Sequence, residues 1–479
     1  MSHKVLWRTS KNAAALLAGT MVRMVATFVF VLYSAAFLGV TGFGQFSLAV
    51  HYFELFLSLA ATGVGILLTR DIARWPRHLP QLLSSALLVL TGLSVLAPLA
   101  MLALAAALRY EAATFLAIAI SALALAPGGV CVVLEAVFVA RGRAEFVTLG
   151  TTIESVLRIA LSMAALNLGG GVLTLMGILV ASRCGLLFVY WLVVRELVAP
   201  EWHFHRRRAW RFAVRWRVFA AENWLATIYT SLDVLILSAV AGEAAVGLYS
   251  AAWKFVRLGT VIAKSYTTAV FPVMSRLFVE SRESFQRLLK HTIRIMCTLA
   301  LPLVIGTSIL AERIVGLLYT AEFAEAAPLL RILIWVLLLD FLNPFLSHTL
   351  FAQKRQHRSL QVAAISLSVS AISMYVLVHF LGAAGVAWGC VLGSLVATCA
   401  YLFFLMSRSE LVGLLVLGAR VLLAAAGLGG VIYVLRAQPL VPLVGASLAV
   451  YAPLLFVVQA LRLDDLRFLS TTLRNKATA

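Results

Sequence analysis

Three cationic side chains lie in an apolar stretch that is long enough to cross a lipid bilayer. Residues 248–272 read LYSAAWKFVRLGTVIAKSYTTAVFP and carry Lys254, Arg257 and Lys264. In an α-helix these three side chains point within about 80° of one another, along roughly 15 Å of the helix axis. Each charge costs about 3 kcal/mol at the bilayer centre, so a row facing lipid is unfavourable. We therefore expect this cationic face to line an internal cavity and to bind an anionic group.

The other ionisable residues in apolar stretches leave an excess of positive charge. With the three above, the cations are Arg23, Arg158, Arg183, Arg294, Arg331 and Arg420, and the acids are Glu54, Glu135, Glu154, Glu222, Asp233 and Asp340. The balance is 9 − 6 = +3, which favours an anionic ligand. Arg guanidinium groups bind phosphate oxygens in pairs, and Lys supplies a mobile point charge.

Several of these residues have structural interpretations as well. Arg23 and Arg183 are expected to line the cavity, although Arg183 could instead balance Glu135. Glu154 and Arg158 have the i, i+4 spacing of a helical ion pair. Asp233 is expected to cap a helix or to pair locally. The cations of the cationic face could likewise pair with Glu54, Glu222 or Asp340, with Lys264 extending to the membrane surface.

The elements that must position these residues are membrane-spanning helices. Of 479 residues, 62% are hydrophobic and 12% are charged, against about 25% charged in soluble domains. The mean hydropathy is +0.99. About fourteen apolar stretches have the roughly 20 residues that a spanning helix needs. We predict an all-α membrane protein with fourteen transmembrane helices, the first of them a retained span rather than a cleaved signal sequence.

The charge distribution predicts the orientation of these helices. The segments expected on the cytoplasmic side collect most of the 39 Lys and Arg residues, including 70–77 and 195–217. The segments expected outside hold Arg109, Arg313 and Arg436. This asymmetry places both termini in the cytoplasm. The net charge of +19 therefore reflects topology, and we expect no nucleic-acid partner. The five cysteines have no metal-ligand spacing, so we expect no metal site.

An internal repeat divides the chain. Residues 38–49, LGVTGFGQFSLA, align with residues 241–252, AGEAAVGLYSAA, so that Gly39 matches Gly242 and Gly44 matches Gly247 at an offset of 242 − 39 = 203. Both copies are expected to run inward from the outer face, which makes the repeat parallel. Transporters with such repeats bind substrate between their halves near the bilayer midplane. We predict lobes at 1–210 (helices 1–6) and 211–408 (helices 7–12), followed by two more helices and a cytoplasmic tail at 409–479.

The same offset suggests a coupling device. It places His51 and Glu54 at the positions of Lys254 and Arg257 in the other copy. A Glu54–Arg257 pair would join the two lobes, and protonation of Glu54 or His51 would release Arg257 for substrate. A permanent ion pair is the alternative. Asp340 precedes Asn343 in the segment DFLNPFL, where proline frees backbone polar groups, so a hinge or ion site is expected there.

Longer segments carry a family resemblance. Residues 38–74 and the segment SLDVLILSAVAGEAAVGLYSAAWKFVRLGTVIAKSYTTAVFPVMSRL at 231–277 resemble polysaccharide flippases of the multidrug/oligosaccharidyl-lipid/polysaccharide superfamily. The segments LLYTAEFAEAAPLLRIL and FLGAAGVAWGCVLGSL are similar to later spans of that family. The resemblance covers nearly the whole chain and rests on patterns of small and apolar residues.

The resemblance implies a V-shaped pair of six-helix bundles that flips lipid-linked sugars by alternating access. The expected substrate is an undecaprenyl-pyrophosphate-linked oligosaccharide for O-antigen, capsule or exopolysaccharide assembly. It is expected to move from the cytoplasmic to the periplasmic leaflet of the bacterial inner membrane, and this movement is expected to be coupled to an ion gradient. A polysaccharide polymerase and a chain-length regulator are further expected partners, and no cofactor is expected.

Two other function classes agree less well with these residues. A cation-coupled multidrug exporter of the same superfamily would share the twelve-helix core, but a cationic drug needs an acidic cavity. A membrane glycan polymerase or glycosyltransferase would need a large outer loop, and the expected outer loops are short. The sequence also lacks a nucleophile–base pair and a phosphate-binding loop. We therefore expect a transporter rather than an enzyme.

Overall fold

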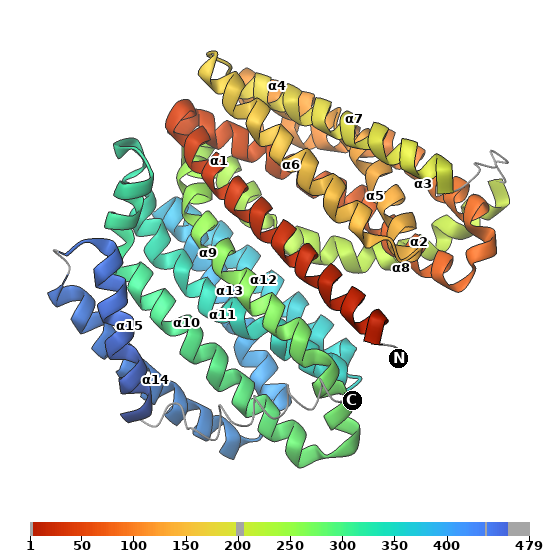
Figure 1. Cartoon of the computed structure of the whole chain (residues 1–479). Helices are drawn as coiled ribbons and strands as arrows, with labels where there is room; N and C mark the ends of the chain where they lie inside the picture. The colour runs from red at the N-terminus through yellow and green to blue at the C-terminus, as the bar shows by residue number, and fades with distance from the viewer. Residues whose placement is uncertain (1–2, 198–205, 436–437, 458–479) are drawn as a thin grey trace. The chain divides into compact units, whose positions relative to one another are not determined.

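The computed structural model describes residues 3–197, 206–435 and 438–457, and every regular element in these ranges is helical. The α-helices are α1 His3–Leu57, α2 Gly63–Arg74, α3 Leu79–Ala107, α4 Ala112–Ala122, α5 Leu125–Ala140, α6 Ala144–Asn167, α7 Val172–Leu197, α8 Arg206–Tyr229, α9 Leu232–Glu280, α10 Arg282–Leu318, α11 Ala326–Ala352, α12 Gln356–Leu381, α13 Ala383–Leu405, α14 Arg408–Val434 and α15 Leu440–Val457 (Figure 1). Short helices lie at η1 Ser58–Thr62, η2 Pro76–His78 and η3 Ala321–Phe323.

The two longest helices are each interrupted at a glycine. Gly39 in α1 has φ 65° and ψ −179°, and Gly242 in α9 has φ 78° and ψ −176°. Only glycine adopts this region of φ/ψ space readily, because it has no Cβ. The two residues are the pair that the repeat aligns at an offset of 203. The same backbone break thus occurs at the same place in both copies, which supports the predicted repeat.

Eleven helical stretches of the described residues are long and apolar enough to cross a membrane. Two of them, 21–74 and 227–280, have 54 residues each. A helix of that length would extend about 80 Å, far beyond the ~30 Å hydrocarbon core. Dividing both at their glycines gives 11 + 2 = 13 spans, and the shorter apolar helix Gly445–Leu455 would be another. The all-helical membrane architecture is confirmed, while the count of fourteen and the cytoplasmic termini stay predictions.

The chain forms two compact units, Met1–Ser250 and Ala251–Ala479. In unit 1, α2 packs on α5 and α8, α5 also packs on α3 and α7, and α1 packs on α4 and α6. Its core is built around Phe138, Tyr190 and Phe212, which are almost fully buried. Residues 206–217, expected to belong to an inner linker, are helical in α8 and pack with unit 1. The predicted lobe boundary at residue 210 stays a prediction.

Unit 2 contains the rest of α9 and helices α10 to α15. α12 lies along α13, which packs on α11, and α11 packs on α10. Gly385, Gly389 and Gly393 repeat every four residues on α13 and bring its backbone against α12. A stripe of small residues allows such close helix contact inside membranes, where apolar surface gains little from association alone.

The last two described helices are attached to unit 2 through α10. α14 packs on both α10 and α15 (Figure 1), and their shared core includes Leu301, Val421, Leu428 and Tyr451. The Tyr451 hydroxyl also donates a hydrogen bond of 3.0 Å to the carbonyl oxygen of Thr298. The helices predicted to follow the twelve-helix core are therefore packed on it through α10.

Candidate functional site

The cationic face lies on the uninterrupted part of α9. Residues 243–280 are helical, so Lys254, Arg257 and Lys264 have the angular spacing that the prediction assumes. The Lys254 side chain is half-buried, and the side chains of Arg257 and Lys264 are exposed. A Cβ added to Gly259 would lie 2.5 Å from a methyl group of Leu337, so Gly259 marks where α9 meets α11. Arg257 is about 200° from Gly259 around the axis. Arg257 is therefore turned away from α11.

One member of the cationic face has an acid within electrostatic range. Asp340 is half-buried on α11, and the charge of Lys264 acts on its carboxylate. Asp340 is one of the acids expected as a partner for the cations of this face, although Lys264 itself was expected to extend to the membrane surface. Lys264 is therefore partly balanced within unit 2, which distinguishes it from an anion-binding residue with no nearby acid.

The segment after Asp340 forms a side-chain link between helices. α11 remains helical through Pro344. The Asn343 amide donates to the Ser394 carbonyl oxygen at 3.1 Å, and the Thr398 hydroxyl donates to the Asn343 side-chain oxygen at 2.7 Å. The polar groups that the sequence suggested for a hinge or ion site thus join α11 to α13. The gating or coupling role of Asp340 stays a prediction.

Two predicted cavity cations meet a common acid in unit 1. The charges of Arg183 on α7 and Arg23 on α1 both act on Glu135 of α5. The Arg23 guanidinium also donates a 2.8 Å hydrogen bond to the Thr151 hydroxyl on α6. The Tyr190 hydroxyl donates to Glu135 at 3.3 Å. Four helices therefore contribute to one polar cluster inside the unit, which we call the Glu135 cluster.

Arg183 retains unused hydrogen-bonding capacity within this cluster. Its guanidinium carbon lies 5.6 Å from the ring centroid of Phe53, a cation–π distance. Its Nε is buried and has no hydrogen-bond partner among the described residues. A buried donor without a partner costs about 1–3 kcal/mol. The charge of Arg183 therefore acts on Glu135, as one interpretation proposed, and its role in lining the cavity stays a prediction.

The structural roles predicted for two other acids are confirmed. Glu154 and Arg158 form an ion pair of 3.1 Å, and the Ser182 hydroxyl donates to Glu154 at 2.8 Å. Asp233 accepts 2.8 Å hydrogen bonds from the Val234 backbone N–H and from the Tyr249 hydroxyl. Both arrangements satisfy a buried carboxylate inside unit 1, so neither residue is a candidate for substrate binding.

His51 and Glu54 lie one turn apart on the second half of α1. The His51 side chain is half-buried, and the Glu54 side chain is exposed. The proposed Glu54–Arg257 pair joins a residue of unit 1 to one of unit 2 and stays a prediction. Sequence reasoning did not single out Glu135 and Tyr190 as a hydrogen-bonded pair. The two residues lie 55 positions apart, and the sequence shows only that both belong to apolar stretches.

Comparisons with known proteins connect this arrangement to transporters. Residues 9–278, more than half of the chain, match the family model described as "Polysaccharide biosynthesis protein", and residues 219–377 match the model named MatE. The lipid II flippase MurJ, in an inward closed conformation, superposes with a TM-score of 0.77 at 12% identity, covering 93% of this chain and 98% of MurJ. At that identity the likeness shows the fold.

Two sequence relatives are named for glycan biosynthesis. A probable low-salt glycan biosynthesis flippase, Agl15 of Haloferax volcanii, is 22% identical over 180 residues, which is 37% of this chain and 38% of Agl15. The capsular polysaccharide biosynthesis protein CapF of Staphylococcus aureus is 23% identical over 186 residues, 39% of this chain and 47% of CapF. The matches span less than half the length of either relative. The chain belongs to the polysaccharide biosynthesis protein family, within the multidrug/oligosaccharidyl-lipid/polysaccharide superfamily of membrane transporters.

Proposed function

We propose that this transporter flips an undecaprenyl-pyrophosphate-linked oligosaccharide from the cytoplasmic to the periplasmic leaflet of the bacterial inner membrane. The observation that carries the proposal is the cationic face of α9, on which Arg257 points away from the contact with α11 at Gly259. A pyrophosphate is a compact anion that Arg257 and Lys254 can bind together. Glycan biosynthesis by the two named relatives supports this substrate class.

Transport by alternating access requires that the anion be held firmly but not trapped. Arg23 and Arg183 of unit 1 supply further cationic groups, and Glu135 limits their net charge. The carboxylate of Asp340 on α11 partly balances the charge of Lys264 on α9 in the same way. In each unit, partly balanced cations would bind the head group without trapping it. No covalent bond is made or broken in this scheme.

An ion gradient would supply the direction of transport. Protonation of Glu54, His51 or Asp340 would change how many cations are available to the pyrophosphate, and so would couple proton movement to binding. The released glycan lipid would then be passed to a polysaccharide polymerase and its chain-length regulator. These partners and the pathway, whether O-antigen, capsule or exopolysaccharide, belong to the proposal.

A flipping assay tests the proposal directly. Sealed inverted vesicles are supplied with labelled undecaprenyl-pyrophosphate oligosaccharide, and its loss from the exposed cytoplasmic leaflet is followed. We expect Arg257→Gln and Lys254→Gln each to slow transport by about tenfold or more, because each removes a charge-assisted contact of about 1.5–3 kcal/mol.

Arg331→Gln is the matched control. Arg331 is also an arginine of a membrane-spanning helix in unit 2, but it pairs with Glu312 at 2.9 Å on the exposed surface. Its substitution should leave the flipping rate near that of wild type. If all three variants inserted normally and flipped at wild-type rates, the cationic face would not be the substrate path.

The match to the MatE model favours a second candidate, a cation-coupled multidrug exporter. An exporter of cationic drugs would need acids where α9 presents three cations. Efflux of an organic cation, measured in the same vesicles, separates the two functions. Efflux that persists when the glycan lipid is not moved would favour the exporter.

A further inference from the structure

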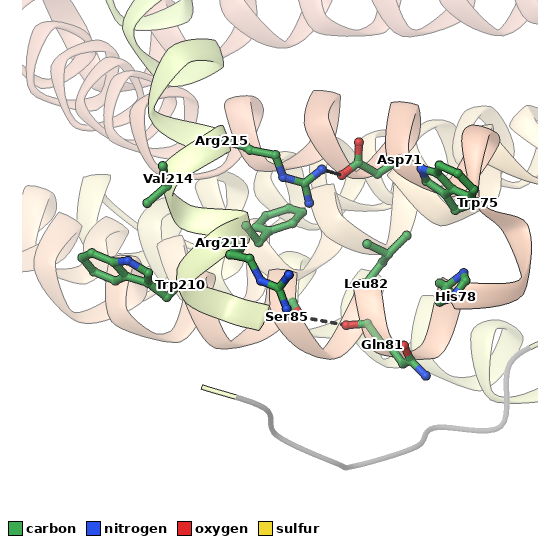
Figure 2. Close-up of a pocket in the computed structure, with 11 residues that line it drawn as sticks. Asp71, Trp75, His78, Gln81, Leu82, Ser85, Trp210, Arg211, Val214 and Arg215 are labelled. Atoms are coloured by element: carbon green, nitrogen blue, oxygen red, sulfur yellow. Dashed lines mark hydrogen bonds and ion pairs between the residues drawn. The ribbon is translucent and has the colours of Figure 1, made fainter. Parts of the chain in front are cut away.

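A second polar site lies in unit 1, and none of the predicted cavity residues lines it. It is a cavity of about 1010 Å³ between the end of α2, the start of α3 and the first turns of α8. Its lining consists of Asp71, Trp75, His78, Gln81, Leu82, Ser85, Trp210, Arg211, Phe212, Val214 and Arg215 (Figure 2). Neither the predicted substrate path nor the coupling residues use this cavity.

The only acid in this lining is already engaged. Asp71 is 2% exposed, and its carboxylate lies 3.0 Å from an Arg70 nitrogen and 2.8 Å from an Arg215 nitrogen. Arg211 precedes Arg215 by one helical turn and extends from α8 toward Ser85 of α3 (Figure 2). With His78 neutral, the lining carries two positive charges and one negative charge. A cavity of this size and charge is suited to an anion.

The remaining lining is amphipathic in the manner of a lipid head-group site. Trp75 and Trp210 are 55% and 71% exposed, and Leu82 and Val214 add aliphatic surface. Indole side chains concentrate at the membrane–water interface, where one edge meets head groups and the other meets acyl chains. The arginines supply the phosphate-binding geometry, and the aromatic and aliphatic side chains supply contacts for the lipid body.

We propose that this cavity binds the phosphate of an anionic phospholipid, with Arg211 as the principal contact and Arg215 held in place by Asp71. The site rests on the orientation predicted from the arginine-rich segments 70–77 and 195–217, which places it at the cytoplasmic surface. Basic pockets between helices on that side are suited to anionic head groups. A bound lipid would join the start of α8 to the α2–α3 turn.

Two lipid phosphates could enter the cavity, and the experiment separates them. Purified full-length protein is titrated with phosphatidylglycerol, with zwitterionic phosphatidylethanolamine, and with undecaprenyl pyrophosphate, and bound lipid is counted by native mass spectrometry. Wild type should prefer phosphatidylglycerol over phosphatidylethanolamine. Arg211→Gln should weaken phosphatidylglycerol binding about fivefold, because each basic residue near the head groups contributes about 1 kcal/mol. Arg211→Lys should keep most of the binding.

Arg217→Gln is the control, since Arg217 is an exposed arginine of α8 outside the cavity lining. It should bind phosphatidylglycerol as wild type does. Equal binding by Arg211→Gln and Arg217→Gln, or equal binding of the two phospholipids by wild type, would overturn the site. If only undecaprenyl pyrophosphate bound in an Arg211-dependent way, the phospholipid assignment would be wrong. Gel filtration and thermal unfolding of each variant confirm that it is folded.

Discussion

At the scale of single residues, the cations in the membrane-spanning helices are not equivalent. Lys264 has an acid within electrostatic range, Asp340, and Arg183 shares Glu135 with Arg23. Arg158 is paired with Glu154 at 3.1 Å. A buried ion pair offers little further attraction to a ligand, because its field is largely cancelled. We therefore predict that Arg257 contributes more to anion binding than Lys264 or Arg158.

The Lys264–Asp340 interaction makes a testable prediction. If the two charges balance each other, replacing one leaves the other uncompensated, and replacing both restores the balance. We expect Lys264→Gln and Asp340→Asn each to lower the flipping rate several-fold, while the double variant recovers toward wild type. Equal and additive losses in the vesicle assay would show that the two residues act independently.

Some residue roles follow from sequence and others do not. The i, i+4 spacing of Glu154 and Arg158 predicted their ion pair, because helical geometry alone brings them together. Asp71 and Arg215 are 144 positions apart, and in the sequence the arginines near them read only as a topology signal. Long-range pairs of this kind depend on which helices pack side by side, which hydropathy does not specify.

At the scale of helices, glycine sets how closely neighbours approach. On α13, a Cβ at Gly389 would lie 2.8 Å from the backbone nitrogen of Met374 on α12, closer than real contacts allow. On α9, Gly259 leaves room for Leu337 of α11 and so fixes which way Arg257 faces. Helix packing at Gly259 thus determines the direction in which Arg257 points.

The α12–α13 contact predicts a selective loss of stability. Gly389→Leu should destabilise unit 2 by about 1–3 kcal/mol, since the new side chain would have to displace backbone. Gly430→Leu on α14 is the control, because no atom lies within 4 Å of a Cβ there. Thermal unfolding in detergent should show a lower midpoint for the first variant only. A shared shift would mean that the bulk of leucine, rather than the contact, is responsible.

At the scale of the whole molecule, the repeat governs the architecture. The apolar stretches and the offset of 203 were visible in the sequence, and the structure places the same break at Gly39 and Gly242. The start of α8 at Arg206 was not predicted, because a run of arginines reads as a loop until a helix packs against it.

The two glycine breaks should be equally intolerant of a side chain. Gly39→Ala and Gly242→Ala each force a residue with a Cβ into a glycine-only conformation, at a cost of about 1–3 kcal/mol. We expect both variants to unfold at lower temperature and to flip substrate more slowly. Gly430→Ala, in regular helix, should not. Wild-type stability in both variants would mean that the chain can run continuously through the breaks.

A pair of glycines near these breaks is related by the same offset. A Cβ on Gly44 would collide with the carbonyl oxygen of Glu243, and a Cβ on Gly247 would collide with that of Val40. Since 40 + 203 = 243 and 44 + 203 = 247, the two contacts are equivalent. In each, a glycine of one copy meets the carbonyl oxygen four residues before the equivalent glycine of the other copy. In evolutionary terms, the two copies constrain each other at this crossing. Substitutions there should be the rarest in the repeat, and a change in one copy should be accompanied by a change in the other.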